Sequence, residues 1–290
     1  MITEAELRTF CEDVYARTYK FHIVTPAYIG KKKLAAEDLQ KEAQKEAIKE
    51  ATLQGMRKFP GIDVAKIWKT VYQIHVFRKS GIYDASVIDN VISANQSWLK
   101  SSGHAFEEIV KFLGNLALNG KGISVILQRD LNTLLKAEEI ANEPRDISWL
   151  KEQIKGQIFD LYTIVEKDGK KYCYGCIQSK TSIRDRVTRD REPSVHAMQS
   201  FFWSVAVVLN GDFLKNGKFR AMVNGGTKEF DINGWHGLYV FSEENTGDRI
   251  FATDFDLKNF SNHAVVAAEY WLSQRQWFDH AWRPDSSGDE

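Results

Sequence analysis

A carboxylate and a lysine are brought together by a predicted β-hairpin in the middle of the chain. Residues 158–166 are apolar and β-branched, residues 171–179 have the pattern of a second strand, and an Asp-Gly turn signal lies between them. Antiparallel pairing about this turn places Asp160 opposite residues 178–180, beside Lys180. The sequence therefore predicts that these two side chains meet at one end of the hairpin.

Such a pair has the residue types that metal-dependent hydrolysis of a phosphodiester requires. A carboxylate holds a divalent metal, which activates water and neutralises charge on the phosphate. A lysine stabilises the developing anion or orients the nucleophile. Mg²⁺ suits a site of carboxylates, carbonyls and water. The alternative is an ordinary cross-strand ion pair, which contributes less than about 1 kcal/mol at a surface.

Arg184, Asp185 and Arg186 follow the second strand directly. Arginine binds guanine through bidentate hydrogen bonds to O6 and N7, and a carboxylate accepts from the N4 amino group of cytosine. These residue types are therefore suited to reading neighbouring G and C in a major groove. The alternative is a solvated helix start, because residues 184–192 hold four arginines and three acids.

The elements that must position these residues fall into two regions, predicted as domains 1–99 and 100–290. The first is predicted to be helical, with helices over residues 3–18, 34–58, 63–79 and 85–99. In the second, helices are predicted over residues 104–117, 128–142, 146–156, 187–203 and 262–277. Further strands are predicted over residues 204–209, 219–223 and 237–241. This mixture indicates an α/β or α+β fold.

Composition limits the classes of function. The 290 residues carry 39 basic and 39 acidic side chains, so nucleic-acid binding would depend on local clusters of Lys and Arg. The three cysteines, an odd count, favour a reducing compartment. Cys173 and Cys176 lack the further ligands of a structural zinc site and are expected to be buried thiols. No apolar run of about 18 residues occurs, so no membrane partner is expected.

Three segments together resemble type II restriction endonucleases of the PD-(D/E)xK superfamily, in the branch that reads CCGG or CCNGG targets. Residues 102–109 are similar to the early helix that carries the first acid, and residues 158–165 to the segment with the metal-binding aspartate. Residues 178–186 are similar to the joint catalytic and recognition strand. The resemblance covers about residues 101–210. It implies a restriction-endonuclease-like mixed central sheet flanked by helices, with an N-terminal helical region added.

By position, the resemblance implies catalytic and metal-binding roles. Asp160 would coordinate Mg²⁺, Lys180 would be the catalytic lysine, and Glu107 would support the metal or water from the neighbouring helix. The backbone carbonyl of Ser179 would be a further metal ligand.

The second acid is where this chain departs from the common pattern. Many superfamily members carry an acid two residues before the lysine, and this chain has Gln178 there. In the CCGG branch the second acid lies on the following helix. Glu192 is the candidate for that catalytic and metal-binding role, with Asp190 as the alternative.

The resemblance implies a Mg²⁺-dependent, site-specific double-strand deoxyribonuclease of a restriction-modification system, in the cytoplasm of a bacterium or archaeon. Arg184 and Arg186 would bind guanines, and Asp185 would bridge cytosine amino groups, in a palindrome containing CCGG or CCNGG. A palindromic target has two-fold symmetry, and a protein with two-fold symmetry matches it. A homodimer is therefore the minimum assembly, and a tetramer is the alternative.

Two other functions fit the residues. One is a structure-specific repair nuclease of the same superfamily, which would cut branched or damaged DNA without sequence preference. The other is a non-catalytic helical DNA-binding module in which Asp160 and Lys180 form a structural ion pair.

Overall fold

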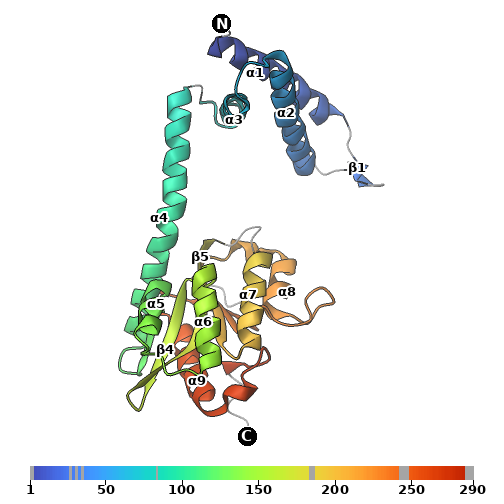
Figure 1. The fold of residues 1–290 in the computed structure, drawn as a ribbon. Helices are drawn as coiled ribbons and strands as arrows, with labels where there is room; N and C mark the ends of the chain where they lie inside the picture. The colour runs from blue at the N-terminus through green and yellow to red at the C-terminus, as the bar shows by residue number, and fades with distance from the viewer. Residues whose placement is uncertain are drawn as a thin grey trace. The chain divides into compact units, whose positions relative to one another are not determined.

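The computed structural model divides the chain into two compact units, Met1–Trp98 and Leu99–Glu290 (Figure 1). It describes residues 3–25, 28–29, 32–33, 36–82, 84–182, 187–241 and 248–284. Each unit is described by itself below.

Helices form the first unit, as predicted. They are α1 (Glu4–Val24), α2 (Ala36–Lys58), α3 (Val64–Ser80) and the first part of α4 (Ala85–Ala117). Strands β1 (Tyr28–Ile29) and β2 (Lys32–Lys33) form a short antiparallel pair that the sequence did not predict. The core of the unit consists of Leu7, Cys11, Val14, Tyr15, Ala47, Ala51, Phe59, Ile67, Val71 and Ile74.

One continuous helix, α4, runs over Ala85–Ala117, where the sequence predicted separate helices over 85–99 and 104–117. The break was expected at the serine and glycine residues 101–103. A glycine inside a helix lowers the stability of the helix by only about 1 kcal/mol relative to alanine, and serine lowers it less. An added Cβ at Gly103 would meet nothing within 4 Å, so no close packing interrupts the helix there. The helix therefore continues to its buried residues Phe106 and Val110 in the second unit.

Six strands form one mixed sheet in the second unit, in the order β3-β4-β5-β6-β7-β8. They are β3 (Ile123–Leu127), β4 (Leu161–Lys167), β5 (Lys170–Ser182), β6 (Trp203–Asn210), β7 (Gly237–Phe241) and β8 (Ile250–Thr253). The first three pair antiparallel, and β5 to β8 pair in parallel. The predicted mixed central sheet is confirmed, while β3 and β8 were not predicted.

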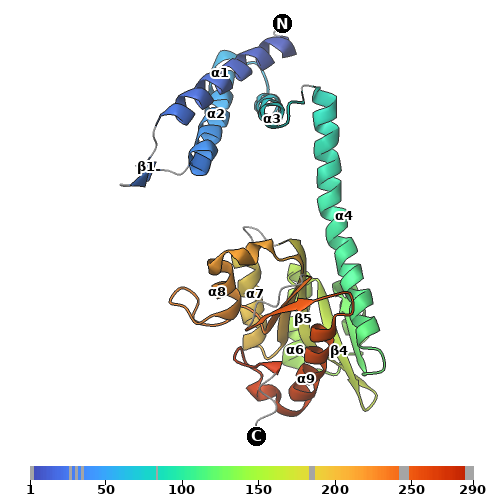
Figure 2. The same cartoon turned by 180° about the vertical axis from the view of Figure 1, so that it is seen from behind.

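Helices cover both faces of this sheet. On one face, α4 and α9 (Lys258–Gln274) pack on the strands, and α9 is seen in Figure 2. On the other face lie α5 (Gln128–Lys136), α6 (Pro144–Gly156), α7 (Val187–Gln199) and α8 (Gly217–Asn224), of which α6 and α7 stand in front in Figure 1. Short 3₁₀ helices, η1 (Asp212–Lys215) and η2 (Arg275–Trp277), complete the unit.

Other predicted elements differ from the structure, among them the helix predicted over 187–203, which ends at Gln199. Residues 219–223 form part of helix α8 and not a strand, because Asn216 caps the helix and Met222 and Val223 pack into the core. The helix predicted over 128–142 ends at Lys136, soon after which Glu138 has a positive φ of 58°.

No helix among the described residues is long and apolar enough to cross a membrane.

Candidate active site

The predicted hairpin exists and places Asp160 at its open end. β4 and β5 pair with Leu161 opposite Ile177, and the tight turn is made by Asp168 and Gly169, both at positive φ. Asp160 immediately precedes β4, and its backbone N–H donates to the carbonyl of Ile177 over 3.1 Å. The ladder therefore fixes this aspartate beside the last residues of β5.

Asp160 and Lys180 are in contact, as the sequence predicted. The Lys180 Nζ atom lies 3.0 Å from Oδ2 of Asp160, and the backbone N–H of Ser179 donates to the same oxygen over 2.7 Å. The side chains of Asp160 and Lys180 are 21% and 27% exposed. This partial burial strengthens the interaction relative to a fully solvated ion pair, yet both groups can still be reached from solvent.

Glu107 of α4 lines the same hollow as Asp160, together with His104 and Gln128. Burial raises the pKa of Glu107 above its ordinary value, and the charge of Asp160 acts in the same direction. A hydrogen bond from His104, at 3.3 Å, and the charge of Lys180 oppose this rise in pKa. Glu107 and Asp160 therefore line one polar hollow, and Lys180 contacts the second of these carboxylates.

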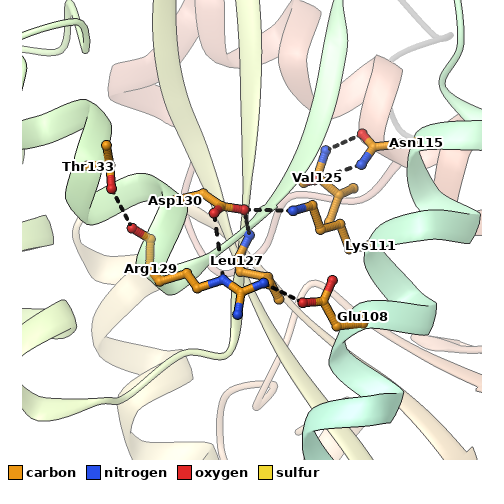
Figure 3. Close-up of polar contacts among 8 residues, drawn as sticks. All are labelled: Glu108, Lys111, Asn115, Val125, Leu127, Arg129, Asp130 and Thr133. Atoms are coloured by element: carbon orange, nitrogen blue, oxygen red, sulfur yellow. Dashed lines mark hydrogen bonds and ion pairs between the residues drawn. The ribbon is translucent and has the colours of Figure 1, made fainter.

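A polar network that the sequence did not predict fixes α4 against α5 and β3 (Figure 3). Lys111 of α4 donates to Asp130 over 2.7 Å, and Arg129 donates to Glu108 over 2.5 Å. Asn115 bonds both backbone groups of Val125, at 2.8 and 2.9 Å.

These contacts matter for the site because Glu108 neighbours Glu107 and because α5 begins at Gln128. The Gln128 backbone N–H donates to the carbonyl of Asp160 over 3.1 Å. The same framework thus positions both carboxylates.

Gln178 stands two residues before Lys180, and it is 2% exposed. Its Nε2 donates to the backbone carbonyl of Asp190 over 2.9 Å, and its Oε1 accepts from Trp235 Nε1 over 2.8 Å. The side chain at the usual place of the strand acid is therefore used to join β5, α7 and the segment before β7.

The two candidates for the second acid, Asp190 and Glu192, lie in the first half of α7, and Glu192 is exposed. Within the part of the chain that the structure describes, no three His, Cys, Asp or Glu side chains are grouped as ligands of one metal ion. The metal-binding role of Glu192 stays a prediction.

The donor set around Asp160 nevertheless fits a hard divalent cation. Asp160 and Glu107 supply carboxylate oxygens, the ligands that Mg²⁺ prefers. The buried hydroxyl oxygen of Ser179 also has no hydrogen-bond partner among the described residues. A buried polar atom of this kind ordinarily bonds to water or an ion, so further hydrogen-bonding capacity is present beside Asp160.

The predicted reading residues Arg184, Asp185 and Arg186 lie outside the described residues. Cys173 and Cys176 are free and buried, as expected, and burial raises the pKa of both thiols.

The chain is similar to known restriction endonucleases. A model of the BsaWI restriction endonuclease type 2 family matches residues 141–277. The solved structure of a pre-specific restriction endonuclease BsaWI–DNA complex matches with 51% sequence identity and a TM-score of 0.82, covering 98% of this chain and 99% of that chain. A specific restriction endonuclease AgeI–DNA complex matches at 15% identity with a TM-score of 0.43, over 92% of each chain. No curated protein matches the chain.

Proposed function

The chain belongs to the BsaWI-like family of type II restriction endonucleases, and on that premise we propose that it is a Mg²⁺-dependent homodimer that cuts double-stranded DNA at a palindrome containing CCGG or CCNGG. The observation that carries the proposal is the contact between Asp160 and Lys180, 3.0 Å apart at the open end of the hairpin. The solved relative with 51% identity is a complex with DNA, which supports DNA as the substrate.

The residues of the candidate site have separate roles in this proposal. Asp160 would hold Mg²⁺, with the Ser179 carbonyl and Glu192 as further candidate ligands, and Glu107 would support the metal or water from α4. When bound, the ion would neutralise phosphate charge and promote ionisation of water. Lys180, held by Asp160, would direct its Nζ–H groups to the oxygens on which negative charge develops. The Ser179 N–H keeps the Asp160 carboxylate turned toward β5.

Sequence reading is assigned in this proposal to Arg184, Asp185 and Arg186. They come two to four residues after Ser182, the last residue of β5, and α7 begins at Val187. Guanidinium groups would bind guanine edges, and the carboxylate would accept from cytosine amino groups. Cleavage and recognition would then be close along one segment of chain.

A homodimer follows from the symmetry of the proposed target. Two identical half-sites are matched by two identical protein chains related by a two-fold axis. Sedimentation of the free and DNA-bound protein distinguishes a dimer from the tetramer alternative.

The test is incubation of the protein with a long DNA of mixed sequence, with and without Mg²⁺, followed by sequencing of the fragment ends. Discrete fragments with one shared end sequence are the expected result. Cutting only at branched or damaged sites would support the repair nuclease, and intact DNA would support the non-catalytic module.

A further inference from the structure

Gln178 and Lys180 lie on the same face of the sheet, because side chains alternate along a strand and the two are separated by Ser179. Yet Gln178 does not open onto the hollow. It is buried with Trp235, which is 0% exposed, and both ends of its amide are bonded. The position of the usual strand acid therefore faces inward in this chain.

The partners of Gln178 fix the direction of its amide. An indole N–H can only donate and a backbone carbonyl can only accept, so Oε1 faces Trp235 and Nε2 faces Asp190. A carboxylate could accept from Trp235 but could not donate to the Asp190 carbonyl. It would leave two oxygens facing each other in a buried place, which is unfavourable.

The carbonyl that Gln178 holds belongs to the first turn of α7, and the next residue is anchored as well. Arg191 donates to the carbonyl of Ile232 over 2.6 Å and to that of Met222 over 3.3 Å. Its guanidinium group lies 5.2 Å from the centre of the Phe230 ring. The first turn of α7 is thus tied to β5 on one side and to the region of α8 on the other.

We propose that Gln178 is a positioning residue that fixes the first turn of α7 relative to Lys180, and so fixes where Glu192 stands relative to Asp160. This inference rests on the proposed function. A site that takes its second acid from a helix needs that helix held in register with the catalytic strand. Gln178 makes that connection two residues from Lys180. An acid at position 178 would itself lie on the catalytic strand, and the site would then not depend on the position of α7.

The first variant is Gln178→Met, which keeps the length of the side chain and removes both hydrogen bonds. We expect about a tenfold weaker binding of Mg²⁺ to the DNA-free protein by titration calorimetry, in line with the loss of a buried hydrogen bond next to the site. We also expect a lower kcat, a higher Mg²⁺ requirement and an unchanged KM for DNA.

Tyr174→Phe is the matched control. Tyr174 lies on the same strand, is fully buried, and donates from its hydroxyl to the backbone carbonyl of Ala264 over 2.9 Å. This variant also loses a buried hydrogen bond from β5, but one directed to α9. It should lower Tm without changing Mg²⁺ affinity or kcat. Equal Mg²⁺ affinity and equal kcat in Gln178→Met and Tyr174→Phe would overturn the positioning role.

Gln178→Glu is the second variant and decides the matter if Gln178→Met does not fold. This variant places an acid at the position where many superfamily members have one. If residue 178 mattered only as a place for a metal ligand, the new carboxylate would bind Mg²⁺ and the Mg²⁺ affinity would rise. The positioning role predicts the opposite, weaker Mg²⁺ binding and slower cleavage, because the tie to Asp190 is broken. Wild-type protein that gives no discrete fragments would instead refute the proposed function, before any variant is compared.

Discussion

Lys180 and Asp160 meet across the open end of a hairpin, with 3.0 Å between the lysine Nζ atom and the aspartate Oδ2 atom. The same oxygen also accepts the backbone N–H of Ser179. The carboxylate is therefore held by the strand that carries the lysine.

Lys180→Ala should remove cleavage and retain DNA binding. The lysine is expected to act on charge that develops in the transition state, so the loss should be about 10²-fold or more in the rate of a single turnover. The measurement is fragment formation at saturating protein, beside a gel-shift titration in the absence of Mg²⁺.

Lys171→Ala is the control for that experiment. Lys171 lies on the same strand and pairs with Glu139 over 2.6 Å, far along β5 from the hollow. Its removal should leave the cleavage rate unchanged. Wild-type cleavage by Lys180→Ala would refute the catalytic assignment.

Glu107→Gln should slow cleavage without lowering stability. Burial raises the pKa of this carboxyl, so its pKa in the folded protein lies above its pKa in the unfolded chain. At a pH above both pKa values Glu107 is ionised in both states, and its burial then lowers the free energy of unfolding. At neutral pH the amide should therefore give an equal or higher Tm. Cleavage should fall by about 10–100-fold if the carboxylate supports the metal or water.

Glu166 provides the comparison, because it is exposed and lies at the turn end of β4, away from Asp160. Glu166→Gln should change cleavage little. If both variants cleave at the wild-type rate, Glu107 has no part in the chemistry.

Asp185→Ala should reduce discrimination between targets while leaving non-specific binding in place. A mismatched base pair in the target typically weakens binding by about 1–3 kcal/mol. In Asp185→Ala, the difference in binding free energy between the cognate DNA and DNA with one C·G pair replaced should shrink by that amount. Competition binding with the two DNAs measures it. Asp212→Ala, which removes an exposed acid on η1, should leave the ratio unchanged. An unchanged ratio for Asp185→Ala would exclude the residue from base reading.

The contact between Asp160 and Lys180 could be predicted because it is nearly local. A short turn with Asp168 and Gly169 joins the two strands, and their pairing, with one register shift between Thr163 and Ile164, places residue 160 beside residues 178–180. Strands β4, β5, β6 and β7 could be predicted for a similar reason, since the pattern of each is contained in a few consecutive residues.

The framework of the site could not be predicted, because its contacts join residues far apart in the chain. Trp235 reaches Gln178 across 57 positions, and Lys111 reaches Asp130 from a different element. No periodicity in either segment identifies the partner. β3 was missed because five residues before a helix carry little pattern of their own, and only pairing with β4 makes them a strand.

A buried histidine that does not line the hollow should make the second unit sensitive to acid. His236 is 1% exposed; its Nδ1 accepts from the Ser204 N–H over 3.1 Å and its Nε2 donates to the carbonyl of Asp279 over 2.7 Å. Both ring nitrogens are used by the neutral form. Burial lowers the pKa of His236 to about 3, although the bond to Asp279 acts in the opposite direction.

The sign of the effect follows from where the proton binds. Below pH about 6.5 the unfolded chain takes up a proton on this ring, and the folded protein does not until pH is near 3. The contribution of neutral His236 to the free energy of unfolding is therefore complete above pH about 6.5 and falls by up to about 1.4 kcal/mol for each pH unit below 6.5. Between pH 7 and pH 5 the free energy of unfolding should drop by about 2 kcal/mol from this residue.

Urea unfolding at the two pH values measures the drop, and His236→Gln should make it smaller by about that amount while lowering stability at pH 7. His196→Gln, which changes an exposed histidine on α7, should leave the drop as in the wild type. Carboxylates that titrate in the same range act equally in all three proteins and cancel in the comparison. An equal drop in wild type and His236→Gln would mean that the ring is protonated in the folded protein, against the neutral pairing seen with Ser204 and Asp279.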